Sequence, residues 1–360
     1  MAEKKNTKKK KKGASPAGKL AILALAVVAC ICAYHAWSWV SDNKLPNFRK
    51  EAVIYVRPET SVDEVYASLI NEAGVRRPYS LNHAFNKKQV ATYMQPGRYE
   101  IKPEYSSVYV ARMLNNCWQS PAKLVLSGTM RLKSQIAAKI SSQLMIDSTE
   151  VMKALEDKEL LSQYGFTPRN VFSLFIPDTY EMYWTATMKD VLAKQKSAYD
   201  AFWSPDRVSK AKAQGLTREQ VSILASIVNG ETNYEPEMPK IAGVYLNRLH
   251  KGMKLQADPT VAYCFGYTLN RVLNKHLEYD SPYNTYKYAG LPPGPISVPT
   301  KACLEAVLHP EGNYLFFCAN SNFDGTHLFA VTFADHLKNA KSFQAALNQK
   351  ALERKSSLAK

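Results

Sequence analysis

The longest apolar stretch of the chain lies near its amino terminus and spans residues 20–40 (LAILALAVVACICAYHAWSWV). This stretch contains no Asp, Glu, Lys or Arg, and a helix of about 20 apolar residues is long enough to cross the hydrocarbon core of a bilayer. Tyr34, Trp37 and Trp39 gather at its far end, as aromatic residues do at a membrane interface. The pattern therefore predicts one transmembrane helix over residues 20–40.

Residues 1–19 precede this helix and contain eight lysines against one glutamate. Because positive residues accumulate on the cytoplasmic side of a membrane, we expect a cytoplasmic tail that contacts anionic lipids of the plasma (inner) membrane. Everything after Ser41 then lies on the extracytoplasmic, or periplasmic, side. A cleaved signal peptide or a lipoprotein modified at Cys30 would have a shorter apolar core. The apolar run continues ten residues past Cys30, which favours an uncleaved anchor.

Residues 41–126 alternate short strand patterns with short helix patterns, which predicts a small β-α-α-β module. Ser61 and Glu64 form a capping box that begins a helix, and Gly74 ends it. Strands are expected over residues 52–56, 96–101 and 123–126, and helices over 61–74, 80–85 and 107–114. This order is similar to a LysM-like module, a fold associated with glycan binding. A structural subdomain without glycan contacts is the alternative.

Residues 127–345 show a longer, mainly helical pattern, which predicts a second domain. Helices are expected over residues 130–163, 190–202, 217–231, 239–249, 300–308 and 333–353, and strands over 314–318 and 327–331. Helices and strands alternate irregularly, so the expected fold class is α+β. Residues 346–360 have the composition of a polar carboxy-terminal tail.

The composition argues against nucleic-acid binding and against a metal or cofactor site. The formal net charge is +16, but much of the excess lies in residues 1–19, and no aromatic-plus-basic motif accompanies it, so we expect no nucleic-acid partner. Two of the six cysteines lie in the apolar run. The others show no metal-ligand spacing, and no Gly-rich phosphate loop is present, so no metal or cofactor is expected.

Glu231 is the first candidate for chemistry. Thr217 and Gln220 form a capping box that begins a helix, and Leu224, Ile227 and Glu231 then follow one another at helical spacing. The carboxyl therefore lies on the apolar face, where desolvation raises its pKa toward the range that suits a general acid. A solvated glutamate at a frayed helix end is the alternative interpretation.

Four blocks follow Glu231 in a fixed order: residues 240–249 (KIAGVYLNRL), 253–260 (MKLQADPT), 281–286 (SPYNTY) and 290–299 (GLPPGPISVP). In this order and at these separations, they resemble the endolytic murein transglycosylases of the YceG-like family. Glu231 matches the catalytic position of that family. The family usually has a second glutamate two positions earlier, and Asn229 stands there in this chain.

The resemblance implies a lytic transglycosylase that acts on peptidoglycan glycan strands. Glu231 would protonate the bond between N-acetylmuramic acid and N-acetylglucosamine, and would then deprotonate the 6-hydroxyl of the muramic acid to close a 1,6-anhydro ring. Gln256, Asn284 and Tyr286 carry neutral, directional groups in the matching blocks and are assigned to substrate positioning. Asp258 is either a second group in the substrate site or the cap of a helix that begins at Pro259.

Two further residues are candidates for sugar contacts. Tyr180 lies in the aromatic segment 175–184 (FIPDTYEMYW), whose rings would stack on sugars or pack in the core. His327 would bond a sugar or end a strand. Pro292, Pro293 and Gly294 read as a groove wall.

The resemblance also implies a role in ending the elongation of nascent glycan strands near the membrane, beside glycan-polymerising synthases. Two other functions stay open on the sequence. The first is a muramidase that uses water, with Asp258 as its second carboxylate. The second is a non-catalytic scaffold that binds peptidoglycan and recruits synthases.

Overall fold

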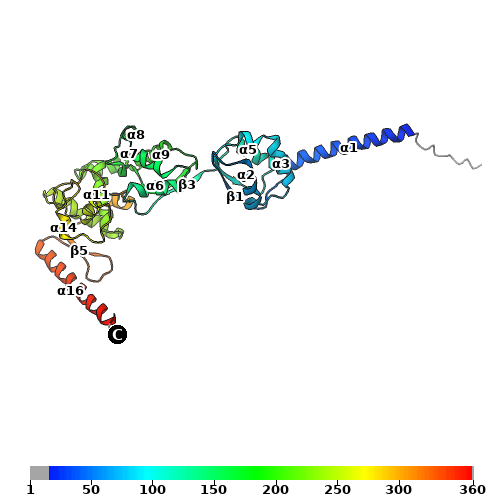
Figure 1. Ribbon diagram of the computed structural model, residues 1–360. Helices are drawn as coiled ribbons and strands as arrows, with labels where there is room; N and C mark the ends of the chain where they lie inside the picture. The colour runs from blue at the N-terminus through cyan, green and yellow to red at the C-terminus, as the bar shows by residue number, and fades with distance from the viewer. Residues whose placement is uncertain (1–15, 359–360) are drawn as a thin grey trace, which may run out of the picture. The chain divides into compact units, whose positions relative to one another are not determined.

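The computed structural model describes residues 16–358, with side chains described as far as residue 353. The predicted lysine-rich tail therefore lies, up to residue 15, outside the described residues. The chain divides into two compact units, Met1–Pro121 and Ala122–Lys360. Three separate two-stranded antiparallel sheets lie among many helices in the described part (Figure 1). The α+β class predicted from the sequence is confirmed.

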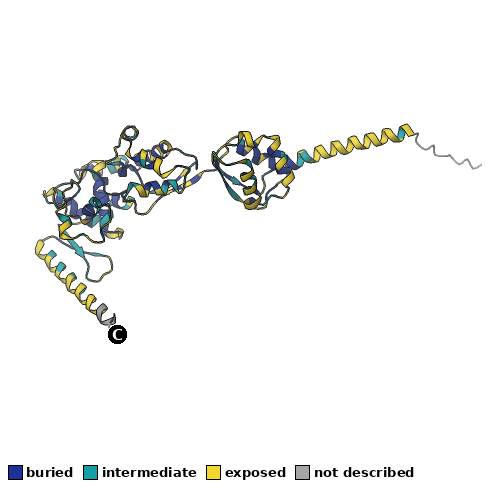
Figure 2. Cartoon of the chain, viewed as in Figure 1, coloured by how far each residue is buried: buried dark blue, intermediate teal, exposed yellow. Residues whose placement is uncertain are grey.

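The first unit begins with α1 (Pro16–Asn43), which contains the predicted apolar helix. Its side chains are exposed along most of its length (Figure 2). Within the described residues, α1 is the one helix that is both long and apolar enough to cross a membrane. At 1.5 Å per residue, its 28 residues extend for about 42 Å, which exceeds a hydrocarbon core of about 30 Å.

The end of α1 is bound to the folded module by a buried polar network. The Asp42 carboxylate accepts a hydrogen bond from Ser80 Oγ at 2.6 Å and lies 2.6 Å from His83 Nδ1. The hydroxyls of Ser80 and Ser107 are 2.9 Å apart, and the Asn47 amide donates to Ser107 Oγ at 2.8 Å. Asp42, Asn47, Ser80 and Ser107 are all buried. Because buried polar groups need partners, this network fixes α1 to the helices that carry these residues.

The module has two paired strands with three α-helices and a π-helical turn between them, where the sequence predicted two helices. β1 (Ala52–Val56) pairs antiparallel with β2 (Gly97–Ile101), and α5 (Ser107–Asn115) follows β2. Between the two strands lie α2 (Val62–Ser68), a π-helical turn (Leu69–Ala73), α3 (Pro78–Lys87) and α4 (Val90–Tyr93). The capping box at Ser61 is present, and Gly74 ends the turn at a φ of 68°. The likeness to a LysM-like module stays a prediction.

The boundary between the units differs from the predicted one. β3 (Ala122–Leu126) pairs antiparallel with β4 (Asp178–Met182), with Leu124 opposite Tyr180, so this strand belongs to the second unit. The module therefore ends at Pro121 instead of residue 126. β4 was not predicted as a strand.

α11 (Arg218–Glu231) lies at the centre of the second unit (Figure 1). Its residues from Val221 to Val228 are all buried, because α10, α12, α13 and α15 pack around it. The helices that surround or precede it are α6 (Lys133–Ser141), α7 (Ser148–Glu156), α8 (Lys158–Ser162), η2 (Val171–Leu174), α9 (Met188–Phe202), α10 (Pro205–Ala213), η3 (Glu235–Glu237), α12 (Met238–His250), α13 (Asp258–Cys264), α14 (Asn274–Leu277) and α15 (Lys301–Leu308).

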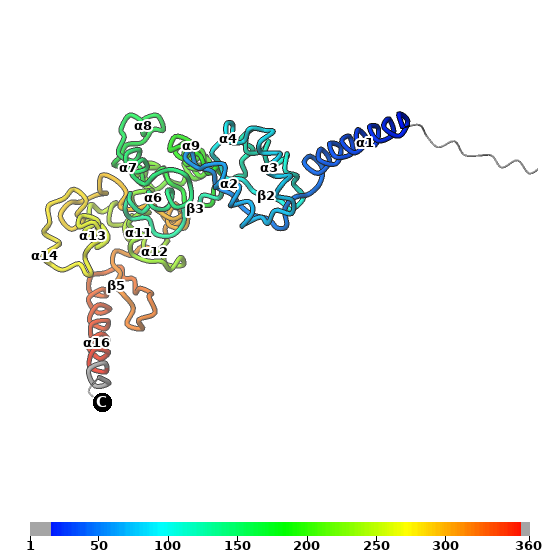
Figure 3. The backbone as a smooth tube through the Cα atoms, turned by 45° about the vertical axis from the view of Figure 1, so that its right-hand side comes forward, coloured from blue at the N-terminus to red at the C-terminus, as the bar shows by residue number. Residues whose placement is uncertain are grey.

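The second unit ends in a hairpin and a long helix. β5 (Phe316–Ala319) pairs with β6 (His327–Ala330), and α16 (Phe333–Leu358) packs against both strands (Figure 3). Residues 346–358 continue α16, so the expected polar tail is not a separate segment.

Candidate active site

Glu231 is the last residue of α11 and is half-buried. The predicted capping box begins this helix, since Thr217 Oγ1 accepts from the Gln220 amide at 3.2 Å. At the other end, Tyr245 Oη donates a hydrogen bond to Glu231 Oε1 at 2.6 Å. The side chain is therefore held by a partner on α12 and is not a freely solvated group at a frayed helix end.

The environment of Glu231 favours its protonated form. The pKa of this carboxyl is raised from 4.5 to about 7, mainly because the group is buried and to a smaller extent because of the charge of Asp258. The hydrogen bond from Tyr245 and the charge of Arg248 act in the opposite direction. A carboxyl with a pKa near 7 can both give and take a proton at neutral pH.

A glycine allows the second carboxylate to come close. A Cβ atom on Gly230 would lie 2.5 Å from Pro259 Cβ and 2.7 Å from its Cγ, which is closer than carbon atoms can pack. Only a residue without a side chain therefore lets α13 pack this tightly against the end of α11. This contact places Asp258, the residue before Pro259, beside Glu231.

Asp258 does not cap α13, contrary to one of its two predicted roles. Ala257 occupies the cap position, and Asp258 is the first residue of the helix. Its Oδ1 accepts a hydrogen bond from Tyr286 Oη at 2.6 Å. A cleft of about 190 Å³ brings the two carboxylates together, and its lining consists of Arg131, Gly230, Glu231, Asp258, Pro259, Ala262, Tyr267 and Val272.

Thr285 joins two of the sequence blocks that follow Glu231, residues 253–260 and 281–286, by hydrogen bonds. Its carbonyl accepts from the Gln256 amide at 3.1 Å, and its hydroxyl accepts from the Ala257 amide at 3.0 Å. The hydroxyls of Thr260 and Thr285 are 2.9 Å apart and fully or almost fully buried. These bonds fix the segments that carry Asp258 and Tyr286.

The three residues assigned to substrate positioning have different surroundings. Tyr286 is half-buried beside Asp258, and burial raises the pKa of its hydroxyl. Gln256 is exposed at a φ of 54°, and its Oε1 accepts from Arg248 Nη1 at 3.3 Å. Asn284 is fully buried, and its amide donates to the carbonyls of Leu277 and Tyr279 at 2.9 and 2.7 Å. The structure therefore gives Asn284 a role in holding its loop.

Comparison with known proteins shows which family this chain belongs to. The model of the YceG-like family matches residues 54–342, which is most of the chain. The chain belongs to the YceG-like family. A solved structure of a yceG-like protein from Listeria monocytogenes is 27% identical, with a TM-score of 0.54, and the match covers 80% of this chain and 98% of that one.

Two curated relatives of this YceG-like protein are each named endolytic murein transglycosylase. The one from Bacillus subtilis is 34% identical over 236 residues, which is 60% of this chain and 64% of the relative. The one from Streptococcus pneumoniae D39 is 25% identical over 351 residues, or 88% of this chain and 63% of the relative. The chain thus spans less than two thirds of the length of these relatives.

Tyr245 and Arg248 are site residues of this YceG-like protein that sequence reasoning missed. Arg248 is buried on α12, three residues after Tyr245, and donates to the carbonyls of Leu255 and Leu315, each at 2.7 Å. The spacing of three places both side chains on one helix face. The sequence did contain one indication of this role, because Arg248 lies on the apolar face of its predicted helix, where a charged residue needs buried partners.

Two predicted site residues lie outside the cleft. Tyr180 is buried on β4 and donates its hydroxyl to the carbonyl of Ile176, so it is a core residue. His327 is the first residue of β6, and its Nδ1 lies 2.8 Å from Glu237 Oε2. Neither side chain lines the cleft with Glu231.

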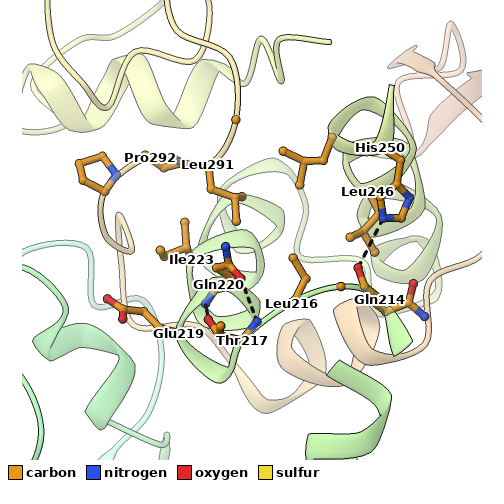
Figure 4. Close-up of a pocket in the computed structure, with 14 residues that line it drawn as sticks. Gln214, Leu216, Thr217, Glu219, Gln220, Ile223, Leu246, His250, Leu291 and Pro292 are labelled. Atoms are coloured by element: carbon orange, nitrogen blue, oxygen red, sulfur yellow. Dashed lines mark hydrogen bonds between the residues drawn. The ribbon is translucent and has the colours of Figure 1, made fainter. Parts of the chain in front are cut away.

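The predicted groove wall lines another pocket. Pro292 and Pro293 border a space of about 640 Å³ at the start of α11, together with Leu216, Ile223 and Leu291 (Figure 4). At 1.5 Å per residue, the beginning and the end of this 14-residue helix are about 20 Å apart. The two prolines are therefore not walls of the cleft at Glu231.

Proposed function

We propose that this protein is a membrane-anchored lytic transglycosylase that cleaves peptidoglycan strands internally, between N-acetylmuramic acid and N-acetylglucosamine. The observation that carries the proposal is the half-buried Glu231 carboxyl, whose pKa is raised to about 7 in a cleft with a second carboxylate. The names of the curated relatives support the same activity. No metal or cofactor enters the proposed reaction.

The proposed reaction uses one group twice. Tyr245 holds Glu231 Oε1, so we assign proton transfer to Oε2. Protonated Glu231 gives its proton to the glycosidic oxygen while the bond from that oxygen to C1 of the muramic acid breaks. The carboxylate then takes the proton of the 6-hydroxyl of the same sugar, whose oxygen bonds to C1 and closes the 1,6-anhydro ring. Glu231 ends the cycle protonated, as it began.

Asp258 has a supporting role in this scheme. The positive charge that develops at C1 in an oxocarbenium-like transition state is stabilised by a nearby carboxylate. Tyr286 orients that carboxylate through its 2.6 Å hydrogen bond. Gln256 Oε1 accepts a hydrogen bond from Arg248, and we assign the exposed amide of Gln256 to hydrogen bonds with substituents of the sugar.

The proposed location follows from α1. Its length and apolar surface suit a single-pass anchor in the plasma membrane, and the lysines before it favour a cytoplasmic amino terminus. The catalytic unit would then act outside the membrane on strands that are still close to the bilayer. We propose that the reaction ends strand elongation, beside the synthases that polymerise glycan.

The products of the reaction test the proposal. Detergent-solubilised full-length protein is incubated with purified sacculi, and the soluble products are analysed by mass spectrometry. We expect 1,6-anhydro ends from the wild type, and none from Glu231→Gln. Glu235→Gln is the matched control, because this exposed carboxyl lies four residues further along the chain and outside the cleft. Full activity of Glu231→Gln would disprove the assignment.

The position of Asp258 in the same cleft favours a second candidate, a muramidase in which water attacks C1. This reaction gives reducing ends without anhydro sugars. It also needs the second carboxylate, so Asp258→Asn would abolish it as fully as Glu231→Gln. In the transglycosylase, Asp258→Asn slows cleavage while the products keep their anhydro ends.

A further inference from the structure

An arginine from outside α11 also lines the cleft that contains Glu231. Arg131 lies in the loop between β3 and α6, and its side chain is half-buried. Its own amide donates to Gln135 Oε1 at 2.7 Å, and the carbonyl of the buried Met130 before it accepts from the Val298 amide at 2.9 Å. The backbone that carries Arg131 is therefore fixed on both sides.

An aromatic ring holds the guanidinium of Arg131. The guanidinium carbon lies 5.2 Å from the centre of the Tyr267 ring, and Tyr267 Oη donates to the carbonyl of Ile296 at 2.7 Å. Such cation–π contacts orient a guanidinium and leave the N–H groups at its edge available. Tyr267 is thus a fixed platform for a charge in the lining of the cleft.

The charge of Arg131 has no ion-pair partner among the residues that the structure describes. In the part of the chain that the structure describes, the Arg131 guanidinium makes neither an ion pair nor a hydrogen bond. Arg248, by contrast, donates to three backbone carbonyls, and its charge lowers the pKa of Glu231. Arg131 therefore has donors and a positive charge to offer to a ligand in the cleft.

The substrate of the proposed function carries the matching group. Muramic acid has a lactyl ether at C3, which ends in a free carboxylate or continues into a peptide stem with carboxylates of its own. Glucosamine has no such group. We propose that Arg131 is the carboxylate-binding residue of this cleft and pairs with a carboxylate of the muramic acid unit. This inference rests on the proposed function. It explains how the cleft would select muramic acid over amino sugars that lack a carboxylate.

The chemistry of arginine suits this role. Its planar guanidinium offers two parallel N–H groups to a carboxylate, whereas lysine offers one point charge. Loss of such a charged partner weakens binding by roughly 10- to 100-fold. Because Arg131 is half-buried, we expect a change near the lower end of this range.

Binding to a protein that cannot turn over tests the inference. The full-length Glu231→Gln protein in detergent is titrated calorimetrically with three soluble glycan fragments. The first is stripped of stems and has free lactyl carboxylates, the second keeps its stems, and the third keeps stems whose carboxylates are converted to amides. We then introduce Arg131→Gln, Arg131→Lys or Lys194→Gln. Lys194 is an exposed cation on α9 and is not part of the cleft lining.

We expect Arg131→Gln to weaken binding of the carboxylate-bearing fragments about tenfold or more, and to leave the amidated fragment unchanged. Weaker binding of the first fragment alone identifies the lactyl carboxylate, and of the second alone a stem carboxylate. Arg131→Lys should fall between the wild type and Arg131→Gln, and it makes the same comparison if Arg131→Gln does not fold. Lys194→Gln should bind all three fragments normally.

Three results would overturn the inference: an equal loss for all three fragments, no loss for any of them, or no binding of any fragment by the parent protein. A different result would reject the proposed catalytic function without rejecting the carboxylate site. If the wild type leaves sacculi uncut while Arg131 still discriminates between the fragments, the catalytic assignment is wrong and the carboxylate site stands.

Discussion

Replacing Glu231 by glutamine should stabilise the folded protein at alkaline pH while it removes activity. The folded environment raises the pKa of Glu231 from 4.5 to about 7, mainly by burial. The folded state therefore binds this proton more tightly than the unfolded state does. The stability that the group contributes is complete below pH 4.5 and is lost as the pH rises through 7.

The magnitude follows from the shift in pKa. Each pKa unit corresponds to about 1.4 kcal/mol, so the charged form of Glu231 costs the fold about 3 kcal/mol above pH 8. Glutamine carries no charge and avoids this cost. Its amide oxygen can still accept the hydrogen bond from Tyr245, so the contact across α11 and α12 is kept.

The assay compares free energies of unfolding at two values of pH. Full-length wild type and Glu231→Gln are unfolded with denaturant in detergent at pH 4.5 and pH 8.5, and the transition of the second unit is followed. We expect a difference under about 0.5 kcal/mol at pH 4.5, and a variant that is more stable by about 3 kcal/mol at pH 8.5. Glu235→Gln, an exposed control, should show no such dependence on pH.

One result would refute the reasoning. If Glu231→Gln gains no stability over the wild type between pH 4.5 and pH 8.5, the carboxyl is not held in a desolvated site. The account of Glu231 as a group that is protonated near neutral pH would then be wrong.

Three further changes probe the surroundings. Tyr245→Phe removes a hydrogen bond that lowers the pKa of Glu231, so the alkaline limb of the pH–rate profile should move up by about one unit. Gly230→Ala places a Cβ atom 2.5 Å from Pro259 Cβ; unfolding experiments should show a loss of about 1–3 kcal/mol, with reduced cleavage of sacculi. Asp42→Ala leaves the Ser80 hydroxyl and the His83 ring without their shared acceptor. The first unit should lose about 2–4 kcal/mol, measured by thermal unfolding, and proteases should cut sooner after α1.

Local signals in the sequence predicted most helices and several strands. The capping boxes at Ser61 and Thr217 are present because all of their partners lie within three residues. β4 was missed because its partner β3 lies more than 50 residues earlier, and four of its five side chains are not buried. Nothing in so short and polar a segment indicates a strand until the pairing is known.

The site could be predicted only in part for a similar reason. Glu231 follows from helical spacing, and the rise in its pKa follows from burial on the same face. Its partner Tyr245 lies on another helix, and the tight contact of Gly230 with Pro259 depends on how two helices pack. Asn284 shows a different limit. Its side-chain amide could have bound a sugar, so the sequence predicted a substrate contact, but in the structure the amide donates to two backbone carbonyls nearby in the chain.

The continuous path of α1 into its module has a mechanical consequence. The helix reaches Asn43 without interruption, and Asp42 is bonded inside the folded module. Each residue of an α-helix turns the chain by about 100°. A residue added to or removed from the exposed part of α1 would therefore rotate the whole module about the helix axis by that angle, whereas a flexible tether would absorb the change. In the anchored protein that we propose, the number of residues in α1 thus sets the rotation of the module relative to the embedded part of the helix.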